Sequence, residues 1–204
     1  MFAGDFHIRE NDLEEICKIF EELLSLISKA QISKVFITGD SFDKITPTSL
    51  ELDCLSNFLS AIKCPVVLIA ANSHESTTQE QSIINHFGIL KDNITVCKEY
   101  IENNTLFVGH FGITQSALSR GGTVDKKELS SYRNVILGHF HNYELIQPNI
   151  CQLGSVRYID SGEDTSIVKR VAICYDVESK KPHWKFPAIK SCYPMINCIL
   201  DGNS

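Results

Sequence analysis

The chain has 204 residues, 43% of them hydrophobic, and a formal net charge of −6. We expect one domain over residues 1–204, with its core over about 1–177, an edge strand and tail over 178–204 and no separate DNA-binding cap. The acidic balance argues against a broad basic surface for nucleic acid. No apolar run approaches the ~18 residues that span a membrane, and Asp5 and His7 interrupt the first apolar stretch, so we expect a cytoplasmic protein without a signal peptide.

The hydrophobic pattern predicts helices that alternate with strands. Residues 11–31 carry apolar side chains at spacings of three and four, which predicts an amphipathic helix that begins with a capping box of Asn11 and Glu14. Further along, the pattern predicts a helix over 49–62 and strands over 34–38, 65–70, 105–108, 135–137, 143–153 and 167–177. This order predicts an α/β fold of two packed mixed β-sheets flanked by helices, a four-layer α/β/β/α sandwich.

Polar residues of a few types follow five of the apolar stretches. They are Asp5-Phe6-His7, Gly39-Asp40 with Asp43, Asn72-Ser73-His74-Glu75, Gly109-His110, and Gly138-His139-Phe140-His141. Because ligands of open α/β sheets bind at the carboxyl ends of strands, these side chains are expected to meet in one crevice. Oxygen and nitrogen ligands without thiolate suit Mn²⁺, Fe, Zn²⁺ or Mg²⁺. Two such metals can clamp a phosphate and activate a bridging water, which predicts a metal-dependent phosphoesterase.

In this order, the motifs resemble those of the calcineurin-like metallophosphoesterase family, whose pattern is DxH, GDxxD, GNH(D/E), GH and GHxH. The resemblance covers residues 4–141. Two later elements, Gly154-Ser155 and Ser161-Gly162-Glu163, look like those after the last motif in the SbcD-type branch of DNA-repair exonucleases. They extend the resemblance to about residue 177.

The resemblance implies seven metal ligands: Asp5, His7 and His141 on one metal, Asp40 bridging both, and Asn72, His110 and His139 on the other. It implies that His74, assisted by Glu75, contacts the phosphate and helps the leaving oxygen depart. Asp43 would orient a metal ligand. The cofactors would be two divalent ions, with Mn²⁺ expected and Fe, Zn²⁺ or Mg²⁺ as alternatives, and hydroxide would attack phosphorus in line.

One motif departs from the family pattern. The third motif is Ala71-Asn72-Ser73-His74 where the family has GNH, so it carries one extra residue. If the strand keeps its register, Asn72 is the ligand and His74 is displaced by one position. If His74 keeps its register instead, Ser73 stands where the ligand belongs.

Three functions fit these residues. The first is a DNA exo- or endonuclease subunit of SbcD type, active in repair or recombination, with DNA as substrate and an SMC-like (SbcC-type) ATPase as partner. A stand-alone phosphodiesterase or phosphatase for nucleotides or small phosphoesters is the second. The third is a non-catalytic interaction module that keeps the scaffold. The sequence is also compatible with a homodimer, and no membrane partner is expected.

Overall fold

Two β-sheets form the centre of the molecule. The computed structural model describes residues 1–71, 83–113, 123–124, 126–160, 163–179 and 183–193. The first sheet is parallel, in the order β1 (Phe2–Ala3), β2 (Val35–Ile37), β3 (Val66–Ile69) and β4 (Ile94–Cys97). The second is mixed, in the order β10 (Glu144–Gln147), β11 (Ile150–Gln152), β9 (Asn134–Gly138), β6 (Leu106–His110) and β5 (Tyr100–Glu102). In it β11, β9 and β6 run parallel, and the two edge strands run antiparallel to their neighbours.

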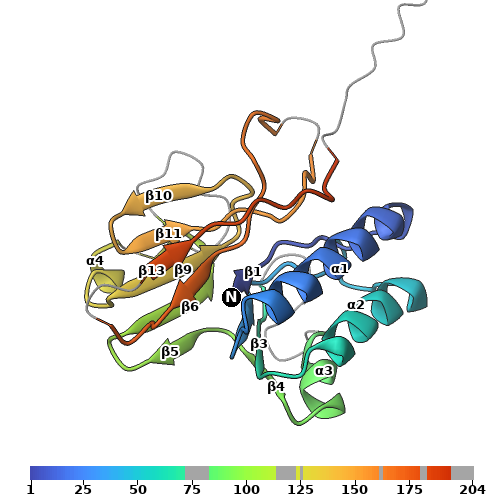
Figure 1. The fold of residues 1–204 in the computed structure, drawn as a ribbon, viewed down its shortest axis with the longest axis horizontal. Coiled ribbons are helices and arrows are strands. Elements are labelled where there is room, and N and C mark those ends of the chain that lie inside the picture. The colour runs from blue at the N-terminus through green and yellow to red at the C-terminus, as the bar shows by residue number, and fades with distance from the viewer. Residues whose placement is uncertain (72–82, 114–122, 125, 161–162, 180–182, 194–204) are drawn as a thin grey trace, which may run out of the picture.

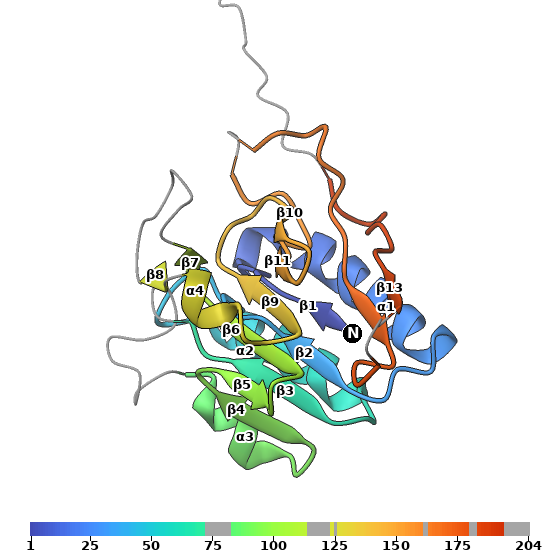
Figure 2. The ribbon, with the colours of Figure 1, turned by 90° about the vertical axis from the view of Figure 1, so that its left-hand side faces the viewer.

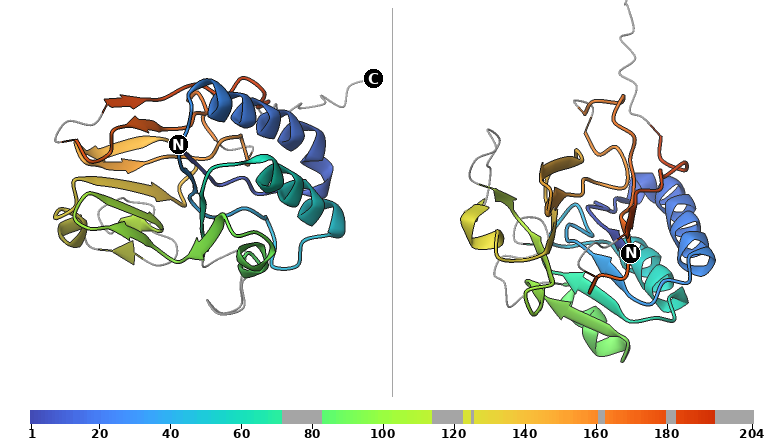
Figure 3. Two further views of the ribbon diagram at one scale, coloured as in Figure 1. Left: turned by 60° about the horizontal axis from the view of Figure 1, so that its bottom comes forward. Right: turned by 60° about the vertical axis from the view of Figure 1, so that its left-hand side comes forward.

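Helices lie outside both sheets. Figure 1 shows α1 (Leu13–Lys29), α2 (Ser49–Ala61) and α3 (Asn85–Leu90) on the side of the first sheet, while the short α4 (Lys126–Leu129) lies beyond the second. Figure 2 shows the second sheet in front of the first with the long helices behind, and the left view of Figure 3 shows the second sheet and the long helices on opposite sides. Two small pairs complete the strands: β7 (Gly112–Ile113) with β8 (Thr123–Val124), and β12 (Ile173–Tyr175) with β13 (His183–Lys185). The predicted α/β fold of two packed sheets flanked by helices is confirmed, with the first sheet wholly parallel.

Because both faces of the central strands are covered, these strands read as continuous apolar runs rather than alternating ones. In β2, Phe36 faces the second sheet together with Phe2, whereas Val35 and Ile37 pack against α1 and α2. A third apolar cluster around Phe107 covers the outer face of the second sheet. These buried apolar layers anchor both sheets and thereby position the described residues that follow β1, β2, β6 and β9.

The start of the first helix differs from the prediction. Residues Glu10–Asp12 form a 3₁₀ turn, α1 begins at Leu13, and Asp12 is its N-cap without a side-chain cap hydrogen bond. The capping box predicted for Asn11 and Glu14 is therefore wrong. A capping box does start α2, where Thr48 accepts from the Glu51 N–H and the Glu51 carboxylate accepts from the Thr48 N–H.

Other differences concern short strands. The single strand predicted over 143–153 is a hairpin of β10 and β11, and only Ile173–Tyr175 of the stretch 167–177 forms a named strand. β4 and β5 were not predicted. In the stretch beyond residue 178, where an edge strand was expected, the structure describes β13, which pairs with β12. Within the described residues, no helix combines the length and apolar character that crossing a membrane requires.

Candidate metal centre

The loops after β1 and β2 run side by side and carry the first two motifs. The Asp5 N–H donates to the Gly39 carbonyl at 3.1 Å, and the His7 N–H donates to the Asp40 carbonyl at 2.9 Å. Phe6 and Ile8 enter the hydrophobic core, whereas the side chains of Asp5 and His7 point toward His110 and Asp40 at the carboxyl ends of the strands.

Backbone strain is concentrated at the same place. Asp5, His7, Asp40 and His139 all have positive φ, at 51°, 44°, 42° and 99°, and they are four of the seven described non-glycine residues with this property. Left-handed conformations cost free energy for residues with a Cβ atom, and folds keep them mainly at functional sites. The strain thus marks these loops as a functional site independently of the side chains they carry.

Two glycines allow the polar side chains to approach one another. Gly39 has φ +109°, and a Cβ there would lie 2.2 Å from His110 Nδ1. At Gly138 a Cβ would lie 2.4 Å from the Thr38 carbonyl oxygen and 2.9 Å from Asp5 Oδ1. Both glycines are therefore required by space, and Gly39 by its backbone conformation as well.

Asp40 lies at the centre of the site. Its Oδ2 atom is 3.4 Å from His7 Nε2 and 3.2 Å from His110 Nε2, and all three side chains are almost fully buried. One carboxylate oxygen thus stands between imidazoles from two different sheets. This is the arrangement expected of a carboxylate shared by two metals.

The other ring nitrogen of each imidazole has its own partner. His110 Nδ1 lies 2.7 Å from the Thr38 carbonyl, which can only accept, so Nδ1 is the donor and carries the proton. His7 Nδ1 lies 3.2 Å from Asp43 Oδ1, and Arg9 Nε pairs with Asp43 Oδ2 at 2.9 Å. In metal sites such partners fix the ring so that the opposite nitrogen points to the metal. The orienting role expected for Asp43 agrees with this contact.

Asp5 and His139 complete the part of the site nearest His110. Asp5 Oδ1 lies 3.5 Å from His110 Nδ1, and Asp5 Oδ2 accepts from the His139 N–H at 3.0 Å. Ligand atoms of Asp40, His110 and His139 all lie within 4.8 Å of one another. These are the described members of the second predicted metal group.

His141 lies on the side of His7, as predicted. The two rings meet edge to face with centroids 5.0 Å apart. His141 Nδ1 lies 3.4 Å from Glu163 Oε1 and 3.5 Å from Asp160 Oδ2. The stretch 154–163, which carries the resemblance to SbcD-type nucleases, therefore borders the site through Glu163.

A buried arginine ties this stretch to the first motif. Arg157 donates to Asp12 Oδ2 at 2.7 Å, to Glu15 Oε2 and to the His7 carbonyl at 3.3 Å. It thereby links the start of α1 and the backbone of a candidate ligand to the loop after β11. The sequence prediction missed Arg157, because nothing local in the sequence indicates that two acids about 140 residues away neutralise it.

The electrostatics favour a cation at the centre. Burial alone would lower the pKa of His110 and of His7, but the neighbouring carboxylates, Asp40 above all, raise both pKa values to about 9. Burial would raise the pKa of Asp40, yet the two imidazoles hold it well below its usual range. The pKa of Asp5 is raised because this carboxyl is fully buried. Without metal, protons on the imidazoles therefore supply the positive charge that the carboxylates require.

The residues present fit divalent metal ions. Asp5 Oδ1, Asp40 Oδ1 and His110 Nε2 are buried and have no hydrogen-bond partner among the described residues. His110 Nε2 is close to Asp40 without being aligned for a hydrogen bond, as expected when both atoms point to a common third centre. Buried polar atoms without partners are costly, and a metal is one way to satisfy them. Of the predicted ligands only Asn72 lies outside the described residues, together with the predicted catalytic residues His74 and Glu75.

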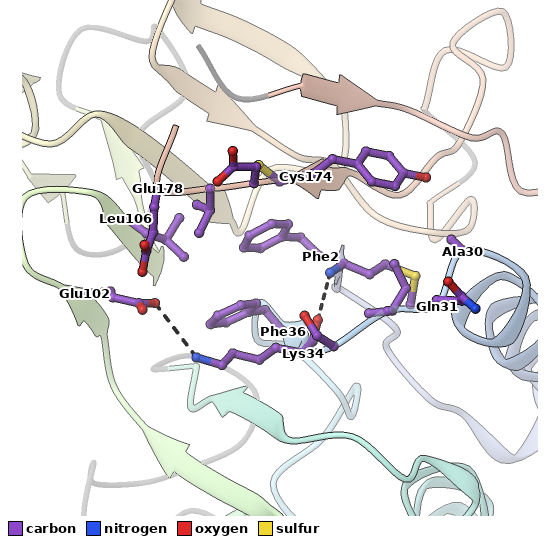
Figure 4. Close-up of a pocket in the computed structure, with 15 residues that line it drawn as sticks. Phe2, Ala30, Gln31, Lys34, Phe36, Glu102, Leu106, Cys174 and Glu178 are labelled. Carbon is purple, nitrogen blue, oxygen red and sulfur yellow. Dashed lines mark hydrogen bonds and ion pairs between the residues drawn. The ribbon is translucent and has the colours of Figure 1, made fainter. Parts of the chain in front are cut away.

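A cavity of about 400 Å³ lies at the ends of the strands opposite the candidate metal centre. Figure 4 shows Phe2 and Phe36 in its lining, and the start of β6 and residues 174–178 line it as well. Lys34 Nζ lies 3.8 Å from Glu102 Oε2, and the Met1 amine donates to the Lys34 carbonyl at 2.8 Å. No histidine is among the described residues that line it, so it offers none of the imidazole ligands found at the carboxyl ends.

Comparisons with known proteins give a likeness in fold. No protein-family model matches this chain, and no curated protein matches it. Among solved structures, Yfce, a phosphoesterase from E. coli, is similar over 93% of this chain and 98% of that chain, with 14% identity and a TM-score of 0.44. A conserved uncharacterized protein from Streptococcus pneumoniae TIGR4, described as a predicted phosphoesterase, is similar over 84% and 78%, with 12% identity and a TM-score of 0.41. At such scores the function has to be argued from the side chains of the site.

Proposed function

We propose that this protein is a divalent-metal-dependent phosphoester hydrolase. The observation that carries the proposal is the position of Asp40 Oδ2 between His7 Nε2 and His110 Nε2, 3.4 and 3.2 Å away, among buried polar atoms without hydrogen-bond partners in the described part of the chain. No thiolate takes part, so the donors suit Mn²⁺, Fe, Zn²⁺ or Mg²⁺, with Mn²⁺ as the metal we propose.

Each side chain has a distinct task in this proposal. Asp5, His7 and His141 would hold one metal, His110, His139 and Asn72 the other, and Asp40 both. When bound, the two metals supply a nucleophile derived from water near neutral pH and neutralise charge on the phosphoryl group. Asp43 and Thr38 keep the rings of His7 and His110 in the required orientation. His74 would give a proton to the leaving oxygen with the help of Glu75, as the sequence predicts.

Reconstitution with metal tests the proposal. Metal-free protein, prepared with a chelator, should take up about two Mn²⁺ per chain and then hydrolyse a chromogenic phosphodiester. Removing the metal again should abolish turnover, and adding Mn²⁺ should restore it. Protein that binds no metal above trace amounts, or whose turnover a chelator leaves unchanged, would contradict the two-metal hypothesis.

For the substrate we propose a DNA phosphodiester first. The support is the stretch that resembles SbcD-type nucleases, since its Glu163 lies 3.4 Å from the candidate ligand His141. Linear DNA should then be degraded with Mn²⁺, and binding should weaken with added salt because phosphate contacts release counterions. The SMC-like ATPase partner stays a prediction, and adding such an ATPase belongs to the same assay.

A small phosphoester is the second candidate, and the charge of the site favours it. Near the candidate ligands, Asp43 is paired with Arg9 and Glu163 with Lys169, Asp160 is exposed, and the chain as a whole carries −6. Such surroundings do not provide the basic track that holds a DNA backbone. The small phosphoester is favoured over DNA if the protein cleaves small phosphodiesters but does not cleave DNA, whether or not an ATPase partner is added.

A further inference from the structure

A buried ion pair lies directly behind His141. The Lys169 ammonium contacts Glu163 Oε2, and both side chains are almost fully buried, at 2% and 7% exposure. The same ammonium donates to the His141 carbonyl at 2.8 Å and to Ser155 Oγ at 2.9 Å. Burying two charges is costly unless each has several hydrogen-bond partners. A buried pair beside a candidate ligand therefore suggests a functional role.

The Glu163 carboxylate already meets several donors. Oε1 accepts from the backbone N–H groups of Ile159 at 2.7 Å and Asp160 at 3.0 Å and also faces His141 Nδ1 at 3.4 Å. Oε2 binds Lys169. An ionised carboxylate offers about four acceptor positions, two on each oxygen, so three donors crowd Oε1 and the ammonium takes one of the two positions of Oε2.

The donors already bound to Glu163 decide between two roles for this carboxylate, as a metal ligand or as the partner of His141. His141, Asp160 and Glu163 place possible ligand atoms within 4.8 Å of one another, so the three could in principle hold a metal of their own. A divalent ion there would share Glu163 with an ammonium and would meet Asp160 at an exposed position, since 66% of that side chain is accessible. A ligand role for Glu163 is therefore disfavoured, and a hydrogen bond from His141 Nδ1 remains.

We propose that the Lys169–Glu163 pair is a positioning device for His141, which fixes its ring so that Nε2 faces the metal held with His7. Lys169 and the Ser155 N–H donate to the backbone carbonyl of His141, and Glu163 Oε1 lies 3.4 Å from its Nδ1, so both ends of the residue are held. The inference rests on the proposed function in that it requires a metal at His141. It adds two residues, Glu163 and Lys169, that act through His141 and touch neither metal nor substrate.

Mn²⁺ titration calorimetry on the full chain tests the inference. Glu163→Gln places an amide N–H₂ against either Lys169 or the backbone donors, so it should weaken one of the two Mn²⁺ sites by about 10–100-fold, the usual effect of losing the partner of a ligating histidine. The other Mn²⁺ site should be unchanged. Asp160→Asn is the matched control, because its carboxylate lies equally near His141 Nδ1 but is exposed, and it should change neither site.

A double variant separates positioning from folding. Glu163→Leu with Lys169→Met replaces the buried pair by apolar side chains of similar size, a change that often preserves stability. Thermal unfolding should then match the parent without metal, and the same Mn²⁺ site should still be weak. In Zn²⁺-loaded protein, the Nδ1–H proton resonance of His141 should appear in the parent and shift or vanish in this variant, while those of the other histidines stay.

The outcomes are distinct. A parent protein that binds no metal overturns the proposed function and the inference together. Two Mn²⁺ sites in the parent that remain unchanged in Glu163→Gln and in the double variant overturn the inference alone. Loss of a further metal in both Asp160→Asn and Glu163→Gln would assign these carboxylates as ligands and would also overturn it.

Discussion

Replacing Asp40 by asparagine is the most direct test of the two-metal centre. The substitution keeps the shape of the side chain and removes only its charge, so the loops after β1 and β2 should keep their backbone hydrogen bonds. The carboxylate is the one group that stands between His7 and His110, at 3.4 and 3.2 Å. Its loss should therefore affect both metals rather than one.

The electrostatics of the site give the magnitude. The pKa values of His7 and His110 rise from 6.5 to about 9 despite burial, and Asp40 makes the largest favourable contribution at each. Such a rise corresponds to about 3 kcal/mol in favour of a single positive charge at each position. A divalent ion at the same place depends on the same carboxylates, Asp40 first among them, so Asp40→Asn should weaken each metal by about 10²-fold.

Calorimetry and metal analysis of the reconstituted protein measure this loss. Asp40→Asn should retain well below two Mn²⁺ per chain after dialysis and should show no turnover of a chromogenic phosphodiester. Asp43→Asn is the comparison variant, since Asp43 meets His7 only at its outer nitrogen and otherwise pairs with Arg9, and it should cost about tenfold in the affinity of one metal. Full metal content and unchanged turnover in Asp40→Asn would refute the reasoning.

Three further predictions follow from the same site. Mn²⁺ affinity should rise as the pH increases toward 9, because the metal displaces protons from His7 and His110, whose pKa values are about 9 without it. A calorimetric affinity that is independent of pH between 6.5 and 9 would contradict this. Gly138→Ala should lower thermal stability by about 1–3 kcal/mol and weaken metal binding, because its Cβ would meet backbone at 2.4 Å; an unchanged unfolding midpoint would argue against the close packing. If the third strand keeps its register, Asn72→Ala should weaken metal binding, while His74→Gln should keep both metals and slow turnover about 10²–10⁴-fold. A metal-loaded structure with the Asn72 carboxamide turned away from the metals would show that the other register applies.

Local pattern was enough to predict most of the candidate ligands. In Asp5-Phe6-His7-Ile8 the two apolar residues enter the core, while the two polar ones follow the carboxyl end of β1 with left-handed backbone and face the site. Strand and helix positions were predictable because buried strands and amphipathic helices have characteristic hydrophobic patterns over neighbouring residues. The predicted capping box of Asn11 and Glu14 was wrong because a polar residue followed three positions later by an acid is a common pattern. Only the backbone geometry determines that Thr48 and Glu51, and not Asn11 and Glu14, cap a helix.

The environment of each ligand was decided by the tertiary structure. Glu163 and Lys169 meet behind His141, and Arg157 reaches the start of α1 from about 140 residues away. Such contacts join segments that are distant in the chain, so no short-range periodicity reports them. Which ring nitrogen of a histidine faces the centre depends on these partners, as with the Thr38 carbonyl at His110 Nδ1. The sequence therefore determined which residues could bind metal, and only the packing of two sheets against each other determined how those residues are oriented and charged.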